Sequence, residues 1–376
     1  MNRSLRMIAA GLFIWGMGEG LFVYFLSIYL GQLGAGPVAI GSILGGMGIM
    51  MVISHIPAGH LADRVGRRPL LVAGWLIGVL AAATMALASS LPLFIAGLWA
   101  YGFTAFIASP LNSYVTAARG SWSLGRALSL TSAAFALGSV LGPITGGWLG
   151  GQFGLRLVFA VAAGIFIVST LVMAGLPPQP RDHHDPKAPP LSLIDNRRYL
   201  GFVALVFVVV FALFLPQQFT PNFLQDVRGL DLRQVGLLGS VGVLGNALLA
   251  LAFGSWFPPR IGMLAGQAFT ALFTLLIWRT AGLPFYALAY FLLGGFRASR
   301  PMMNALARGL VHPSQMGLAF GLTETLASIS LTLAPLVSGL LYHSSPVLMY
   351  PVSLGLIALA FGLTLWLAPH PGGEYA

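Results

Sequence analysis

The stretch GHLADRVGRR at residues 59–68 concentrates charge in a chain of which only 7% is charged. It carries one aspartate, three arginines and two glycines, and long apolar segments lie on both sides of it. Short basic turns between apolar segments are typical of the cytoplasmic loops of membrane proteins. The stretch therefore predicts a turn between two transmembrane helices.

The composition points to the same class of protein. Hydrophobic residues make up 57% of the 376-residue chain, which is more than a water-soluble domain can tolerate on its surface. A spanning helix needs ~20 mostly apolar residues, and many runs reach that length. They show no alternation of apolar and polar residues, which excludes a transmembrane β-barrel. We expect an all-α membrane protein with the lipid bilayer as its solvent.

The formal charge of +10 does not indicate nucleic-acid binding, because Lys187 and eighteen arginines are spread over short loops. The chain has no cysteine, which rules out disulfides and thiolate metal sites. His183 and His184 lie in a polar segment that we interpret as a solvated linker and not as a metal site. No nucleotide or catalytic motif is present. We expect no cofactor, no metal and no enzymatic activity.

The apolar runs divide the chain into spans. The first run continues from Arg6 to about Leu30, which favours an uncleaved first helix over a signal peptide. Twelve spans are predicted, with ends at 6–30, 37–58, 69–89, 92–117, 127–150, 155–176, 199–224, 234–257, 261–280, 284–307, 316–342 and 346–368. A proline-rich segment separates two sets of six, so the predicted domains are 1–176 and 199–376, joined by the cytoplasmic linker 177–198.

The basic residues predict the orientation. With a cytoplasmic N-terminus, thirteen of the nineteen lie on the cytoplasmic side and four on the opposite side, whereas Arg297 and Arg300 fall within a span. Both termini are therefore expected in the cytoplasm, in a multi-pass protein of the plasma (inner) membrane.

The two halves also share a sequence frame. Seven residues of the first half recur 192 positions later in the second half. The first set is Gly125, Ala127, Leu130, Thr131, Pro143, Gly147 and Leu149, and its counterparts are Gly317, Ala319, Leu322, Thr323, Pro335, Gly339 and Leu341. Phe25 and Leu30 recur 194 positions later, two residues out of step with that frame, as Phe219 and Leu224. Two pseudo-symmetric six-helix bundles in the same orientation are typical of parallel-repeat transporters.

Two motifs resemble a known family. Gly59-x3-Asp63-Arg64-x-Gly66-Arg67-Arg68 resembles the loop motif of the major facilitator superfamily. Gly138-x3-Gly142-Pro143-x2-Gly146-Gly147 resembles the span-five motif of that family's proton-driven antiporters. The chain departs from the antiporter pattern in span four, because residues 98–102 contain no arginine, and the second-half copy of the loop motif is reduced to Gly254-x5-Arg260.

The resemblance implies a role for the loop motif. Its residues are expected to form a conformational latch between the two halves, comprising Gly59, Asp63, Arg64, Gly66, Arg67 and Arg68. A purely topogenic loop would explain the arginines, which face the anionic inner leaflet, but it would not explain Asp63 or the glycines.

Two acidic residues lie within spans and are the candidates for proton coupling. A charge at the bilayer centre costs roughly 2.5–3.5 kcal/mol on insertion scales, so Glu19 and Glu324 are functional candidates. Glu19 lies thirteen residues after Arg6, or ~20 Å along a helix. The alternative is a neutral carboxyl that is held by a hydrogen bond and has only a structural role.

Glu324 has a candidate partner. Arg300 and Glu324 are each twelve residues from His312, where two antiparallel spans join. We therefore expect a buried ion pair of Glu324 with Arg300 or Arg297. One arginine remains, and it suits either an anionic substrate group or snorkelling to the interface. The predicted substrate-binding residues are Trp15, Tyr101, Asn112, Arg297 and Arg300.

Glycines at four-residue spacing give one span a smooth face on which another helix can pack closely. Gly138, Gly142, Pro143, Gly146 and Gly147 are predicted to pack one half against the other.

These expectations converge on a secondary transporter. We expect proton-coupled export of a small apolar or amphipathic compound by alternating access, carried out by a monomer and driven by the proton gradient. The alternatives are metabolite uptake by proton symport or uniport and, from another class, a non-transporting membrane receptor or scaffold.

Overall fold

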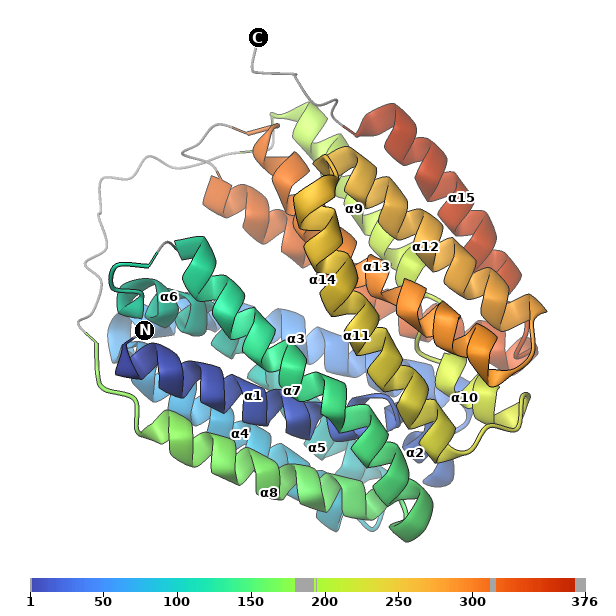
Figure 1. Cartoon of the computed structure of the whole chain (residues 1–376), viewed down its shortest axis with the longest axis horizontal. Helices are drawn as coiled ribbons and strands as arrows, with labels where there is room; N and C mark the ends of the chain where they lie inside the picture. Colours follow the sequence, from blue (N-terminus) through green and yellow to red (C-terminus); the bar gives the residue numbers. More distant parts are fainter. Residues whose placement is uncertain (1, 123, 180–192, 194, 312–315, 369–376) are drawn as a thin grey trace. The chain divides into compact units, whose positions relative to one another are not determined.

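The computed structural model describes residues 2–122, 124–179, 193, 195–311 and 316–368. Within these ranges it describes all side chains except those of residues 55–64, 109, 124–126, 129, 254–255 and 316–318. Every regular element in the described ranges is a helix (Figure 1), which confirms the predicted all-α class.

The first half contains eight α-helices and one short 3₁₀ helix. In chain order they are α1 (Arg3–Val23), α2 (Leu26–Gln32), α3 (Pro37–Val65), α4 (Arg67–Leu87), α5 (Leu91–Phe103), η1 (Thr104–Ile107), α6 (Ala108–Ala118), α7 (Leu124–Phe153) and α8 (Leu155–Ala174).

The second half contains seven helices. They are α9 (Arg197–Phe214), α10 (Thr220–Asp226), α11 (Leu232–Trp256), α12 (Pro259–Arg279), α13 (Leu283–Arg308), α14 (Met316–Ser344) and α15 (Met349–Leu367).

Eleven of the described helical segments are long and apolar enough to cross a membrane, and one of them runs from α5 through η1 to the end of α6. The predicted span at 284–307 is not among them. It coincides with α13, which has 26 residues and therefore sufficient length, but which carries Arg297, Arg300 and Arg308. Its charges, and not its length, set this helix apart from the other spans.

The sequence repeat corresponds to a repeated break in the helices. α1 stops shortly before Phe25 and α9 before Phe219, and a seven-residue helix starts directly after each of these phenylalanines. Both rings are completely buried. The first span of each half is thus interrupted in the same way.

The chain forms two compact units. Unit 1 comprises Met1–Ala35, Gly46–Pro186 and Leu230–Ser240, and unit 2 comprises Gly36–Gly45, Lys187–Gly229 and Val241–Ala376. Compared with the predicted domains, the first residues of α3 join the second unit and the first residues of α11 join the first.

In unit 1, α1 packs between α7 and α8 (Figure 1). The contact with α7 brings backbone against backbone, because a Cβ added to Gly142 would lie 2.4 Å from the Cα of Gly20. Gly138 and Gly146 face α1 in the same manner, against the carbonyls of Phe13 and Leu21. The prediction that these three glycines pack one half against the other is therefore wrong. The smooth face exists, but α1 of the same half covers it.

In unit 2, α12 packs along α13, and α14 and α15 pack on α9. Close approach again depends on glycine: a Cβ on Gly294 would lie 2.2 Å from the backbone nitrogen of Asn246, and one on Gly245 would lie 2.2 Å from the carbonyl oxygen of Phe291. The hydroxyl of the fully buried Tyr199 donates to the carbonyl of Ala319 at 2.6 Å, which joins α9 to α14.

The contact between α1 and α7 predicts a specific loss of stability. Gly142→Ala places a methyl group on immovable backbone atoms of Gly20, so we expect it to destabilise the protein by ~1–3 kcal/mol. Thermal unfolding in detergent measures the effect.

Gly164→Ala on α8 is the matched control, because a Cβ there would meet nothing within 4 Å. It should leave stability unchanged or raise it by ~0.5–1 kcal/mol, since alanine is the better helix former. Equal effects of the two substitutions would contradict the close approach of α1 and α7.

Candidate functional site

The site in unit 1 is built around Glu19 on α1. Its side chain is half-buried, and the hydroxyl of Tyr101 donates a hydrogen bond to Glu19 Oε2 at 2.7 Å. Tyr101 lies on α5, in the segment 98–102 where the antiporter pattern expects an arginine. A neutral hydrogen-bond donor therefore contacts the carboxyl from the span in which a cation was expected.

An aromatic stack fixes the position of Tyr101. Its ring lies parallel to Phe166, with centroids 6.0 Å apart, and Phe166 stacks in turn on Trp15 at 4.1 Å. The edge of Phe22 completes the cluster, 5.3 Å from the tyrosine ring. Because Tyr101 is only 6% exposed, its hydroxyl is held in one direction.

Trp15 itself belongs to the core of unit 1. It is 5% exposed, lies 5.1 Å from Trp75 and sits over Gly78, where a Cβ would lie 2.1 Å from its ring. Such a ring offers little surface to a ligand, so we assign it to the support of Tyr101 and not to substrate binding. Asn112, by contrast, lies on α6 with an exposed side chain, and its role in binding remains a prediction.

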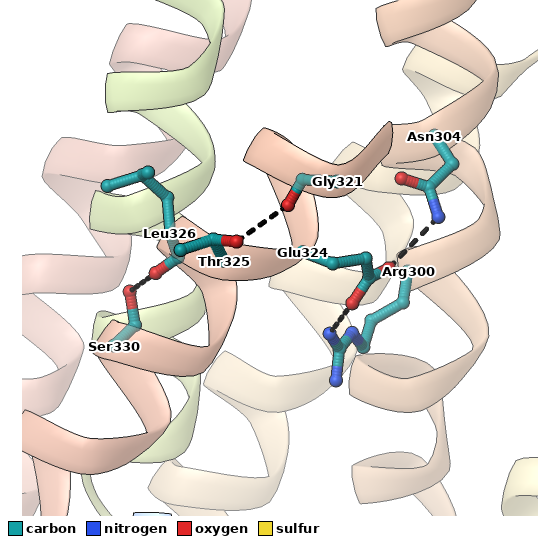
Figure 2. Close-up of polar contacts among 7 residues, drawn as sticks. All are labelled: Arg300, Asn304, Gly321, Glu324, Thr325, Leu326 and Ser330. Atoms are coloured by element: carbon teal, nitrogen blue, oxygen red, sulfur yellow. Dashed lines mark hydrogen bonds and ion pairs between the residues drawn. The ribbon is translucent and has the colours of Figure 1, made fainter. Parts of the chain in front are cut away.

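The site in unit 2 joins α13 to α14 (Figure 2). Arg300 forms an ion pair with Glu324, and Asn304 donates from Nδ2 to Glu324 Oε1 at 3.0 Å. The structure thus contains one of the two pairings that the equal distances from His312 predict. The pair is not buried, however, because the side chains of Arg300 and Glu324 are 29% and 48% exposed.

Asn304 was not identified as a partner of Glu324 from the sequence. It follows Arg300 by four residues, so both side chains lie on the same face of α13, and this spacing would have indicated it. Nearby hydroxyls do not take part: Thr325 donates to its own helix at the carbonyl of Gly321 (Figure 2). Arg297 lies one turn earlier with an exposed side chain, and no described residue forms an ion pair with it.

The loop motif is described only in part. The side chains of Asp63 and Arg64 and the surroundings of Gly59 lie outside the described part of the structure. Gly66 separates α3 from α4 with φ +93°, a conformation that favours glycine.

The two arginines that follow contact unit 1. Arg67 donates to Gln179 Oε1 at 3.1 Å, and Arg68 donates to the carbonyl of Ala174, at the end of α8, at 2.8 Å. Gln179 also donates to the carbonyl of Tyr114 at 3.0 Å. Arg67 therefore holds the start of the linker through Gln179, and Arg68 holds the end of α8, and the sequence suggested neither contact.

Two predicted packing residues of α7 do contact the second half of the sequence. Within unit 1, Pro143 and Gly147 lie against α11, since a Cβ on Gly236 would be 2.3 Å from the Pro143 carbonyl oxygen and 3.0 Å from the Gly147 Cα. Within unit 2, Pro335 and Gly339 of α14 meet Gly41 of α3 at 2.4 and 3.2 Å in the same way. The shared proline–glycine frame thus marks two equivalent helix crossings.

No group of three or more histidine or acidic side chains that could hold a metal ion occurs among the residues that the structure describes. His183 and His184 lie outside those residues.

A chain of repeated apolar helices long enough to span a membrane, with an acid on α1 and an ion pair between α13 and α14, has the architecture of a multi-pass membrane transporter. The sequence model of the Major Facilitator Superfamily matches residues 8–256 and 220–375. The chain belongs to this superfamily.

The chain is similar to several members of known transporter families. It is 23% identical to Multidrug resistance protein 1 of Bacillus subtilis, over 98% of this chain and 97% of that protein. It is 25% identical to an uncharacterized MFS-type transporter of Methanocaldococcus jannaschii, but there the match spans only 45% of the relative's length. A crystal structure of a mutant of the nucleoside transporter NupG has the same fold, with a TM-score of 0.86 at 14% identity over 97% of this chain and 100% of that one.

The ion pair in unit 2 can be tested by a double-mutant cycle. Arg300→Gln and Glu324→Gln should show a coupling energy of about 1 kcal/mol in thermal unfolding, because partly exposed pairs contribute little more. The control cycle combines Arg297→Gln with Glu324→Gln and should be additive. Equal coupling in both cycles would mean that Glu324 does not distinguish Arg300 from Arg297.

Proposed function

We propose that this transporter is a proton-coupled exporter of a small apolar or amphipathic compound, and that Glu19 carries the proton. The observation that supports the proposal is the hydrogen bond from Tyr101 to Glu19. α1 is continuous from Arg3 to Val23, so Glu19 lies ~20 Å along the helix from Arg6. That distance reaches the interior of a hydrocarbon core ~30 Å thick.

The chemistry of this contact suits a reversible proton site. An ionised carboxylate accepts the tyrosine O–H, whereas a protonated carboxyl can donate to the tyrosine oxygen, since a hydroxyl is both donor and acceptor. Tyr101 therefore satisfies Glu19 in both protonation states. Because the donor is neutral, this contact does not neutralise the ionised carboxylate, whereas an arginine partner would stabilise the ionised form and oppose uptake of the proton.

The cluster in unit 2 has a different role in this proposal. Arg300, Asn304 and Glu324 form a switchable group that opens when a substrate or a proton arrives. The exposed side chain of Arg297, one turn before Arg300 on α13, suits an anionic part of the substrate.

The comparisons support transport over a receptor or scaffold, and the name of the Bacillus subtilis relative favours export. The likeness to a nucleoside transporter keeps metabolite uptake by symport or uniport as the second candidate. The direction of the flux that a proton gradient drives separates the two.

The test uses purified protein in liposomes, with the fluorescent lipophilic dye rhodamine 6G as the probe. An imposed pH gradient should drive dye flux in the wild type. Glu19→Gln should abolish this gradient-driven flux but retain dye exchange in the absence of a gradient, because only the proton step is lost. Gradient-driven flux at the wild-type rate in Glu19→Gln would eliminate Glu19 as the proton site.

Tyr101→Phe tests the positioning of the carboxyl. It keeps the stacked ring and removes the hydroxyl, so we expect gradient-driven flux to fall about tenfold, which corresponds to the loss of one charge-assisted hydrogen bond. Tyr29→Phe is the matched control, because Tyr29 packs against Phe94 and Phe159 by its ring. This variant should transport normally. Equal loss in both variants would assign the effect to packing.

A further inference from the structure

Ser240 of α11 forms two hydrogen bonds to the backbone of α7. Its hydroxyl accepts from the Ile144 N–H at 3.0 Å and donates to the Val140 carbonyl at 2.7 Å. In a regular α-helix these two groups, four residues apart, bond to each other. The serine hydroxyl therefore lies beside one backbone hydrogen-bond position of α7, and Ser240 is only 9% exposed.

Pro143 weakens α7 at the same place. It lies inside the helix and has no N–H, so the carbonyl of Ser139 receives no helical bond from it. Gly236 and Gly239 bring α11 close to the proline, since a Cβ on Gly239 would be 2.9 Å from Pro143 Cβ. This approach places the Ser240 hydroxyl at the next backbone hydrogen-bond position of α7, between the Ile144 N–H and the Val140 carbonyl.

The internal repeat supplies a natural comparison. The frame that relates Pro143 to Pro335 and Gly236 to Gly41 also relates Ser240 to Gly45. At the second crossing, within unit 2, a Cβ on Gly45 would lie 2.9 Å from the Thr332 carbonyl oxygen. Glycine thus occupies the equivalent of Ser240, and the contact there contains no inserted hydroxyl from α3. The two crossings share their glycines and prolines but differ in this one polar group.

We propose that Ser240 is a reversible polar latch, which holds α11 on α7 and releases when these two helices part during transport. The proposal rests on the alternating-access cycle proposed above. Release leaves no backbone group unpaired, because the Ile144 N–H and the Val140 carbonyl can bond to each other once the hydroxyl leaves. The latch therefore biases the conformational equilibrium without blocking it. The crossing of α3 and α14 has no such bias, so the two crossings need not open equally easily.

The distance between α7 and α11 measures the latch directly. The chain has no cysteine, so Gln152→Cys on α7 and Arg233→Cys on α11 provide two specific spin-label sites, and both side chains are exposed. Electron paramagnetic resonance in lipid nanodiscs, without substrate, gives the populations of short and long distances. Ser240→Ala should raise the ratio of long to short distances about fivefold, which is the effect of one typical hydrogen bond.

Two further variants keep the result interpretable. Thr145→Val removes a hydroxyl of α7 that bonds only to its own helix, at the Leu141 carbonyl, and should leave the ratio unchanged. Ser240→Thr keeps the hydroxyl and should stay closer to the wild type than Ser240→Ala does.

Any of three results overturns the latch. They are an unchanged ratio of long to short distances in Ser240→Ala, an equal change of that ratio in Thr145→Val, and a single distance in every variant. The measurement needs neither substrate nor a proton gradient. A fivefold shift combined with absent pH-driven dye flux in the wild type would therefore refute the proposed proton coupling and leave the latch intact.

Discussion

Backbone contact between α1 and α7 is the constraint on which the site in unit 1 depends. Lipid provides no hydrophobic force between helices, so close packing of small residues takes its place. Gly16 and Gly20 of α1 face the backbone of α7, and Gly18 faces the ring of Phe166 on α8. These two neighbours cover two sides of α1. The side chain of Glu19 points to another side of the helix, where Tyr101 lies.

Much of the fold follows from the sequence because it depends on local properties. Apolar runs of sufficient length define the spans, and the 192-residue frame relates the halves. Phe25 and Phe219 lie two residues out of step with that frame, and the helix breaks before them were not predicted from the sequence. The pairing of Glu324 with an arginine of the preceding helix was also predictable, since two helices that share a turn place equidistant residues at equal depth, but the sequence left both Arg300 and Arg297 as candidates.

The remaining features of the fold and of the site depend on which helix surfaces meet, and the spacing of residues in the sequence does not give that information. The four-residue spacing of Gly138, Gly142 and Gly146 predicts a close contact, but it does not say that α1 is the neighbour. Glu19 and Tyr101 are 82 residues apart in the chain and belong to helices that do not follow one another. The extent of exposure of the Arg300–Glu324 pair likewise depends on side chains from several helices.

The exchange of short segments between the two units has a consequence for biosynthesis. The face of α7 around Pro143 and Gly147 is covered by the start of α11, and the start of α3 packs on the end of α14. A ribosome makes these partners one after the other, at about 5–20 residues per second. α7 therefore enters the membrane before the start of α11 has been synthesised. The start of α3 lacks its partner, the end of α14, until nearly the whole chain has been made. Lipid or an insertion factor must shield both glycine surfaces in the interval, so each half completes its folding only when the other has been synthesised.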